Sequence, residues 1–416
     1  MSSGHDGSTT APAEAGDHRP LRIVVCHNYY QQRGGEDQVF EDEVDLLRSR
    51  GHRVVPFTRR SGDISALTSI STAAGAVWNR PVARELAALV EREDADIVHF
   101  HNWLPLISLA APVAARAAGA AVVQSLQNYR FVCPKGTFFR DGRVCEDCLS
   151  TRTLWPAVQH GCYRESRTAS AVVSAALVTH RARGTVANTI DAYIAASRFT
   201  AFRLGEALLP QDRIHVKPNF LATDPGEGQG RGGFAMYLGR LSPEKGVATL
   251  LAAWEELEDP PPLKIAGTGP LDDDVRRAAD RSPRIEYLGF ASEEEVDRTM
   301  KGATYLVLPS VNYEGFPKTI VEAFARGTPV IASRLGAMIE AINDGVTGRH
   351  FAAGNAADLA AVVREMQGNP DATSAMRGPA RSVYLDRYTP DRNYAIMMEI
   401  YRSARARRRA TREGDE

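Results

Sequence analysis

The feature that most restricts the fold of this chain is an apolar run that leads into a glycine- and proline-containing turn and then into a helical pattern. The run occupies residues 305–308, the turn contains Gly315 and Pro317, and apolar residues at helical spacing follow. A short continuous apolar run is typical of a parallel strand that is buried on both faces, and proline is favoured in the first turn of a helix. The pattern therefore predicts a strand, a turn and a helix of a parallel α/β sheet, with the turn at the carboxyl end of the strand.

Two glutamates flank this turn and lie eight positions apart. Glu314 precedes the expected helix, and Glu322 lies about one turn into it. Free backbone N–H groups at the start of a helix attract phosphate, and a carboxylate near them can accept hydrogen bonds from the two hydroxyls of a ribose. The arrangement can hold a sugar nucleotide, with Glu314 beside the sugar. A strand, glycine turn and helix without a ligand would give the same spacing, so further motifs have to separate the two interpretations.

The length of 416 residues favours two domains over one. Strand patterns alternate with helical patterns in both halves, which predicts an α/β protein with two Rossmann-like, doubly wound parallel-sheet domains that face each other across a cleft. The expected strands are 21–26, 53–57, 96–100, 121–125, 192–196 and 214–216 in the first half, and 234–238, 263–266, 285–288, 304–308 and 329–332 in the second.

The segment between the halves is rich in glycine and poor in apolar residues, as is typical of a linker. The expected organisation is a disordered tail at 1–20, a first domain at 21–218 with an insertion at about 129–165, a linker at 219–233, a second domain at 234–385, and a helix at 386–416 that crosses back to the first domain and ends in a basic tail.

Composition and charge exclude several classes of protein. The formal net charge of −1 gives no overall attraction to nucleic acid, and 44% hydrophobic residues is ordinary for a globular protein. No stretch approaches 18 uncharged apolar residues, and the first 20 residues contain no apolar run of the kind found in secretion signals. We therefore expect a soluble, cytoplasmic protein that binds no nucleic acid.

Two further glycine loops follow expected strands of the second half. The loop at 239–246 carries Arg240 and Lys245, which either bind a diphosphate or pair with acids such as Glu244 or Glu314. The second loop is Gly267-Thr268-Gly269. It does not continue as a dinucleotide-binding loop because Asp272 stands where the third glycine is needed, so a nicotinamide cofactor is not expected. That loop can instead shape a base pocket beside residues 287–290.

Four of the five cysteines cluster in the insertion, at Cys133, Cys145, Cys148 and Cys162. Four thiolates of this kind could close a tetrahedral structural zinc site, or they could be free, partly buried thiols. Aromatic and basic residues of the insertion could contact a glycan or a lipid phosphate, or could form a small core of their own.

Taken together, Gly-Arg-Leu-Ser-Pro-Glu-Lys-Gly at 239–246, Gly-Thr-Gly-Pro at 267–270, Leu-Gly-Phe at 288–290 and the Glu-x7-Glu pair resemble one family. The chain resembles the retaining sugar-nucleotide glycosyltransferases with the two-Rossmann GT-B fold, the large glycogen-synthase-like group called family 4. The resemblance runs from about Leu21 to the last helix. It implies transfer of a hexose or N-acetylhexosamine from a nucleoside diphosphate sugar, UDP in preference to GDP, to a hydroxyl acceptor. It also implies retention of the anomeric configuration without a metal ion or another catalytic cofactor.

The resemblance also implies roles for individual residues. Arg240, Lys245 and Glu314 would act in catalysis, with the two cations on the departing diphosphate. The donor would contact a set drawn from both domains: Gly34, Gly35, Gly239, Gly267, Gly269, Leu288, Gly315, Phe316, Pro317, Lys318, Thr319 and Glu322. The acceptor would be a glycan, a lipid-linked molecule or a small molecule bound by the first domain, which allows contact with the inner face of a membrane.

One position departs from the family pattern. Many relatives carry histidine after the strand expected at 121–125, where this chain has Gln127 followed by Asn128. Glutamine can donate a hydrogen bond but cannot carry a charge, so either residue or the nearby His101 would have to contact donor or acceptor. Two alternatives to a transferase stay open. One is an epimerase or hydrolase with the same donor pocket, against which Gln127 argues because it is neither an acid nor a base; the other is a pseudoenzyme that binds the donor without turnover, which the substitution allows.

Overall fold

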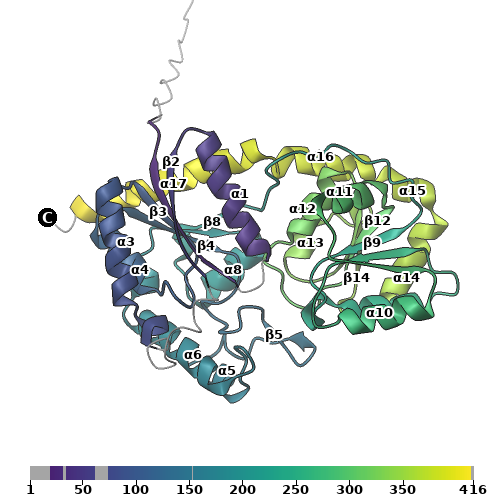
Figure 1. The fold of residues 1–416 in the computed structure, drawn as a ribbon, viewed down its shortest axis with the longest axis horizontal. Coiled ribbons are helices and arrows are strands. Elements are labelled where there is room, and N and C mark those ends of the chain that lie inside the picture. The colour runs from purple at the N-terminus through teal and green to yellow at the C-terminus, as the bar shows by residue number, and fades with distance from the viewer. Residues whose placement is uncertain (1–18, 31–33, 61–73, 152, 414–416) are drawn as a thin grey trace, which may run out of the picture.

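The computed structural model describes residues 19–30, 34–60, 74–151 and 153–413, and it places two α/β lobes side by side (Figure 1). The first lobe holds a six-stranded parallel sheet in the order β2-β1-β3-β4-β7-β8. Its strands are β1 (Arg22–Tyr29), β2 (Arg53–Arg60), β3 (Ile97–Asn102), β4 (Ala121–Leu126), β7 (Ala192–Ala195) and β8 (Ile214–Val216).

The second lobe holds another six-stranded parallel sheet, in the order β11-β10-β9-β12-β13-β14. Its strands are β9 (Ala235–Leu238), β10 (Leu263–Ala266), β11 (Ile285–Gly289), β12 (Tyr305–Leu308), β13 (Val330–Ser333) and β14 (Gly348–Phe351). The strand order reverses between β9 and β12, as it does between β1 and β3 in the first sheet. The predicted class, two doubly wound parallel sheets, is confirmed.

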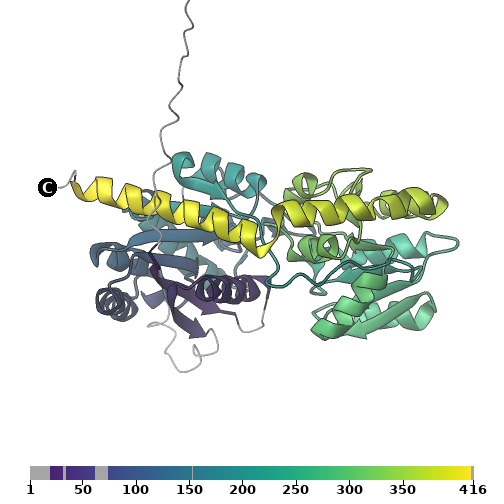
Figure 2. The same cartoon turned by 90° about the horizontal axis from the view of Figure 1, so that it is seen from above.

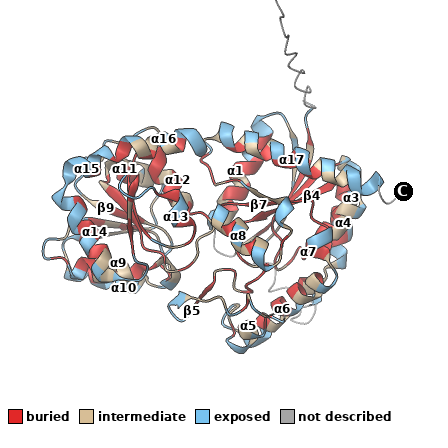
Figure 3. Cartoon of the chain, turned by 180° about the vertical axis from the view of Figure 1, so that it is seen from behind, coloured by how far each residue is buried: buried red, intermediate tan, exposed pale blue. Residues whose placement is uncertain are grey.

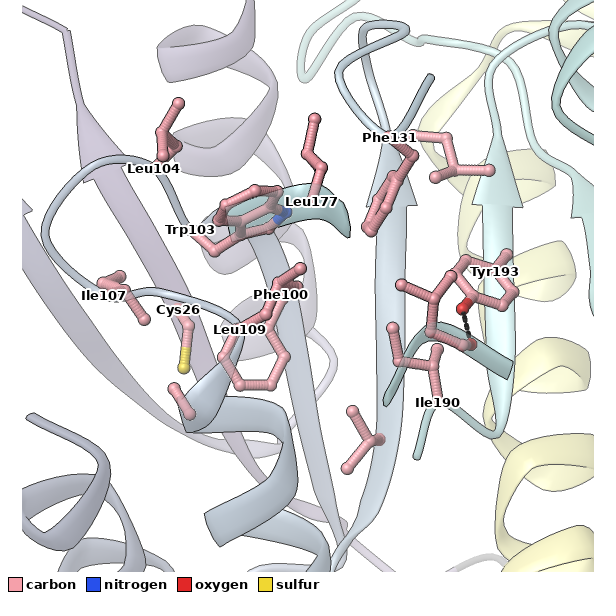
Figure 4. Close-up of a cluster of buried hydrophobic side chains, with 14 of the residues drawn as sticks. Cys26, Phe100, Trp103, Leu104, Ile107, Leu109, Phe131, Leu177, Ile190 and Tyr193 are labelled. Carbon is pink, nitrogen blue, oxygen red and sulfur yellow. Dashed lines mark hydrogen bonds between the residues drawn. The ribbon is translucent and has the colours of Figure 1, made fainter. Parts of the chain in front are cut away.

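Helices cover both faces of the first sheet. The helices α3 (Arg80–Glu93), α4 (Ala110–Ala117) and α6 (Arg167–Ala182) share one hydrophobic cluster with the sheet, and α1 (Gly35–Ser49) and α17 (Pro390–Glu413) share another. Figure 4 shows part of the first cluster, including Cys26, Phe100 and Trp103. The hydroxyl of Tyr193 in that cluster donates a hydrogen bond to the carbonyl of Val186. The shorter helices of this lobe are α5 (Trp155–Gln159), α7 (Thr185–Asn188) and α8 (Arg198–Ala207).

The second sheet is enclosed in the same way, with its strands buried between helices (Figure 3). One face packs against α9 (Val247–Glu255), α10 (Asp272–Arg281) and α14 (Ala356–Gly368). The other packs against α11 (Glu293–Gly302), α12 (Lys318–Ala325), α13 (Ala337–Ala341) and α16 (Arg377–Arg387), and α15 (Pro370–Ala375) precedes α16. The hydroxyl of Ser292, the N-cap residue of α11, accepts a hydrogen bond from the N–H of Glu295.

Helix α17 lies along the first lobe although it follows the whole of the second (Figure 2). Met397, Ile400 and Tyr401 of α17 are fully or almost fully buried in the first lobe's core. Its arginines are partly engaged: Arg407 pairs with Asp212 over 2.6 Å. The basic segment is therefore helical through Glu413, with residues 409–413 exposed.

All the expected strands are present, but β1 and β2 each end three residues later than expected, and three short strands were not expected. Strand β1 continues to Tyr29, three residues beyond the expected end, because its polar residues are satisfied inside the fold: His27 bonds Asp37 over 2.7 Å. Strand β14 and the two-residue strands β5 (Phe139–Arg140) and β6 (Arg143–Val144) were not expected. Short strands with polar residues give no periodic signal.

The segment expected to be a linker contains no helix or strand, but it is not loosely held. The N–H groups of Gly228, Gly230 and Gly232 donate to carbonyls of the second lobe over 2.9 Å each, and the Arg377 guanidinium donates to the Gly228 carbonyl over 2.9 Å. Residues 1–18 of the expected tail lie outside the described residues, and Arg19 pairs with Asp96 over 2.5 Å. In the described part of the chain, no helix is both long enough and apolar enough to cross a membrane.

Candidate functional site

Two loops meet at the carboxyl edge of the second sheet, where the strand order reverses. The β9 loop (residues 239–246) follows β9, and the β12 loop (residues 309–317) follows β12. Ligands of open α/β sheets bind at such crossing points because the two loops diverge there to opposite faces of the sheet. These loops therefore define the candidate site, and they contain the motifs singled out from the sequence.

The two loops are tied closely together. The N–H of Val311 donates to the carbonyl of Glu244 over 2.9 Å. Gly246 has a φ of +71°, and a Cβ at this position would lie 1.8 Å from the carbonyl oxygen of Pro309. Only glycine allows both this backbone conformation and this approach. The geometry of one loop therefore depends on that of the other.

Lys245 and Glu314 form an ion pair across the two loops. The Nζ of Lys245 lies 2.7 Å from Oε1 of Glu314, and the Ser310 hydroxyl donates to the same oxygen over 2.7 Å. The Lys245 side chain is 30% exposed and that of Glu314 is 11% exposed. Such pairing was one of the two interpretations of Lys245, and the structure shows it; the phosphate role stays a prediction. Arg240 is exposed on the same loop, and its carbonyl accepts a hydrogen bond from Tyr237.

The loop after β10 lies beside the β9 loop, and the end of β11 lies beside the β10 loop, where the Gly267 N–H donates to the Gly289 carbonyl over 2.7 Å. Cβ atoms added to Gly267 and Gly269 would lie 1.9 and 2.4 Å from carbonyl oxygens of the β9 loop. Close packing of the two loops therefore requires both glycines. Leu288 is half-buried against the core of the second lobe, whereas Phe290 is 84% exposed. An aromatic side chain with so much exposed surface is available to a ligand.

Helix α12 begins at Lys318, directly after the β12 loop, with Pro317 as its N-cap residue and Thr319 half-buried beside it. Glu322 is half-buried one turn later. Its removal from water raises the pKa of its carboxyl group, and the positive charges of Lys318 and Arg326 oppose that rise. Hydrogen-bond donors of a ligand would add to this compensation and favour the ionised carboxylate.

The first lobe holds the β12 loop from the other side of the cleft. Lys318 pairs with Asp42 of α1 over 2.5 Å. A Cβ on Gly315 would lie 2.9 Å from the carbonyl oxygen of Gln127. Three consecutive carbonyls of the loop, those of Glu314, Gly315 and Phe316, accept hydrogen bonds from Tyr129 at 3.1 Å, Thr200 at 3.3 Å and Asn219 at 2.8 Å respectively.

Two family models match consecutive parts of the chain. The model "Glycosyl transferase 4-like domain" matches residues 22–219, and the model "Glycosyl transferases group 1" matches residues 234–369. The two matches follow the two sheets just described. The chain belongs to the GT-B glycosyltransferases of the family 4 type.

Individual relatives of this GT-B protein agree with that assignment. A glycogen synthase of Mycobacterium tuberculosis is 36% identical over 153 residues, which cover 35% of this chain and 36% of that protein. The matched part is therefore about a third of the relative's length. Among solved structures, sucrose-phosphate synthase from Thermosynechococcus elongatus superimposes with a TM-score of 0.70 at 16% identity, covering 93% of this chain and 99% of that one. Anabaena HepE in complex with UDP gives 0.66 at 16% identity, covering 92% and 100%.

The first-lobe side of the GT-B cleft is only partly as expected. Gly34 and Gly35 are exposed at the start of α1, where the Gly34 N–H donates to the Asp37 carboxylate over 2.9 Å. Asn128 donates to Glu36 over 2.9 Å. Gln127 is half-buried, with its carbonyl at the β12 loop. These positions are consistent with a site that includes the N-terminal end of α1.

His101 is buried in the first lobe, where it lines a small cavity together with Asn128 and Arg130. Its side chain is 1% exposed and lies 3.4 Å from the Glu43 carboxylate and against the ring of Phe40. Burial lowers the pKa of His101 from its usual value. The direct contact with donor or acceptor expected for His101 would need this side chain to leave the core, so it forms no part of the function proposed below.

Sequence reasoning missed the residues that bridge the two lobes. Asp42, Tyr129, Thr200 and Asn219 lie 97 or more positions from the β12 loop residues they touch. The residues that flank these partners in sequence give no pattern that would predict such distant contacts. Asp42 is one of three buried acidic residues of α1, together with Asp37 and Glu43, so its sequence position alone did not single it out.

Proposed function

We propose that this chain is a retaining glycosyltransferase that moves a sugar from a nucleoside diphosphate donor to an acceptor hydroxyl without a metal ion. The observation that carries the proposal is the convergence of Lys245, Glu314 and the N-terminus of α12 at the crossing point of the second sheet. UDP is favoured because HepE holds UDP in the same fold. The acceptor is a glycan, a lipid-linked molecule or a small molecule.

Each part of the donor has a partner with suitable chemistry. The exposed Arg240 and the half-buried Lys245 bind the diphosphate, together with free N–H groups at the start of α12. Glu322 accepts hydrogen bonds from the ribose hydroxyls. The exposed ring of Phe290 stacks on the base. Glu314 contacts the sugar.

The residues of the β9 loop act on the charge that develops during transfer. The bond between the anomeric carbon and the phosphate oxygen breaks, its electrons leave with the diphosphate, and the acceptor oxygen bonds the same carbon. The acceptor proton passes to the departing phosphate oxygen. Lys245 turns from Glu314 to this oxygen and stabilises its charge together with Arg240, which lowers the barrier most at the transition state.

A donor panel tests the proposal. Purified protein is mixed with UDP- and GDP-sugars without acceptor, and calorimetric binding and nucleotide release are both measured. We expect one UDP-sugar to bind with slow release, and that sugar then serves in an acceptor screen. Rapid release without acceptor would favour an epimerase or hydrolase, and a lack of binding to every donor would favour a pseudoenzyme.

Substitution of Glu322 should weaken UDP binding in a pH-dependent way. The ionised carboxylate is the better acceptor, and its pKa is raised, so affinity for UDP should fall on acidification at a higher pH than an exposed glutamate would cause. Glu322→Gln should lower the affinity at pH 8 by about 10- to 100-fold, as expected for hydrogen bonds to a charged group, and should flatten the pH dependence. Calorimetric titration with UDP from pH 5 to 8 measures both effects.

Glu340→Gln is the matched control. Burial also raises the pKa of Glu340, but this residue lies on α13. Its variant should keep both the affinity and the pH profile of the original protein. An unchanged profile in Glu322→Gln would show that Glu322 is not the ribose acceptor.

A further inference from the structure

The four clustered cysteines meet around one small cavity of the first lobe. Cys133, Cys145, Cys148 and Cys162 line it together with Lys135 and Arg140. Cys133 precedes the β5–β6 hairpin, Cys145 and Cys148 follow it, and Cys162 follows α5. No disulfide joins them in this described part of the chain. Thiols that are separate in sequence have therefore been brought to a single place by the fold.

The segment that carries these cysteines has little regular structure to hold it. Between residues 129 and 165 it contains two strands of two residues each and a helix of five residues. Five of its residues other than glycine have a positive φ: Phe138, Asp141, Leu154, Arg164 and Glu165. Such backbone is strained and persists only where other interactions fix it. Small segments of this kind are usually fixed by disulfides or by a metal ion.

Hydrogen-bond donors and positive charges surround the sulfurs. The backbone N–H of Asp147 hydrogen-bonds the Cys145 sulfur and that of Ala157 the Cys148 sulfur. Four thiolates around Zn²⁺ carry a net charge of −2. Lys135 and Arg140 line the same cavity and bring positive charge near it, although Arg140 also pairs with Asp147 over 2.8 Å.

A second cluster of metal-binding residue types lies in the same lobe and is already satisfied. Glu43, His99 and His101 have ligand atoms within 4.8 Å of one another. The ammonium of Lys217, however, lies 2.6 Å from the Glu43 carboxylate, and both ring nitrogens of His99 are hydrogen-bonded to Tyr401 and Ser125. A cation there would have to displace a buried lysine.

From these observations we propose that Cys133, Cys145, Cys148 and Cys162 together bind one Zn²⁺ ion in a tetrahedral structural site. Among the described residues, no three of these sulfurs lie within 4.8 Å of one another. Zn–S bonds of about 2.3 Å therefore require the cysteine side chains to turn into the cavity as each thiol loses its proton to solvent.

The site would act on the cleft through the segment it fixes. Phe138 packs edge-on against Tyr313 of the β12 loop, with ring centroids 5.8 Å apart. Glu146, next to Cys145, pairs with Arg203, whose guanidinium lies over the ring of Tyr313. By fixing the segment that contains Phe138 and Glu146, zinc would support the position of Tyr313 and the β12 loop.

Metal analysis of the full chain tests the proposal directly. The protein is purified from zinc-supplemented cells without a metal-affinity step and is analysed by mass spectrometry of its metals and by thiol titration. We expect one zinc per chain, released as a mercurial reagent titrates four thiols. Cobalt exchanged into the site should show the absorption bands of a tetrahedral tetrathiolate.

Two variants locate the ion. Cys145→Ser/Cys148→Ser should lose the zinc, whereas Cys26→Ala should retain it, because Cys26 lies in β1 away from the cavity. A folded original protein without zinc would overturn the proposal, and so would four thiols that titrate only after reduction, since these would be disulfides. Iron in place of zinc would overturn the choice of metal.

Discussion

Lys245→Ala is expected to lower kcat for sugar transfer by roughly 10²- to 10³-fold, the usual effect of removing one group that stabilises developing negative charge. Its ammonium is proposed to take up the charge of the departing diphosphate, and nothing else on the β9 loop except Arg240 carries a positive charge. The fold should be unaffected because Lys245 lies at the surface on a short turn. Initial rates at saturating donor, with a melting curve of each variant, measure the two effects separately.

Lys264→Ala provides a matched control. Lys264 is also 30% exposed and is paired with one carboxylate, that of Glu286 at 3.0 Å, but it lies on β10. This variant should keep its turnover. If Lys245→Ala also kept near-normal turnover, the ion pair with Glu314 would be its whole role and the diphosphate assignment would be wrong.

Lys217→Met is expected to destabilise the first lobe by about 3–5 kcal/mol, since it leaves a buried carboxylate without its partner. Lys217 and Glu43 have side chains that are each 1% exposed, with 2.6 Å between Nζ and Oε1. Burial tends to raise the pKa of Glu43, but the charge of Lys217 outweighs it and holds this pKa well below its usual range. Urea unfolding, followed by a probe in the first lobe, measures the loss.

Two comparisons separate this effect from a general loss of charge. Lys301→Met breaks a surface pair with Asp297, in which both side chains are 32% exposed, and should cost less than about 1 kcal/mol. Adding Glu43→Gln to Lys217→Met removes the stranded charge and should recover part of the stability. Equal losses in the two lysine variants would contradict the buried-pair explanation.

The sequence was sufficient for features that depend on neighbouring residues. The order of strands and helices, the turn with Gly315 and the cap at Ser292 all follow from local pattern. The family-type motifs also located the β9 and β12 loops at the correct strand ends. These features could be predicted because apolar periodicity and turn-forming residues can be recognised within short segments of the sequence.

The remaining features depend on distant contacts and on burial. The position of His101 at the end of a strand suggested contact with a ligand, but its side chain is buried beside the Glu43 carboxylate of α1. The glycine-rich linker looked flexible, but carbonyls of the second lobe bind its N–H groups. Lys318 was expected to touch donor, and its partner Asp42 could not be foreseen because the cleft brings them together only in the folded chain.

The path of α17 has a consequence for how the protein is made. Met397, Ile400 and Tyr401 complete the core under the first sheet, yet they are synthesised about 180 residues after the last strand of that sheet ends near Lys217. At usual ribosomal speeds of about 5–20 residues per second, the first lobe would wait roughly 10 to 40 seconds with this apolar face uncovered. The second lobe, whose strands and helices are contiguous, can close within that time. The core of the lobe that comes first in the sequence is therefore completed last. Its apolar surface would be accessible to chaperones during that interval.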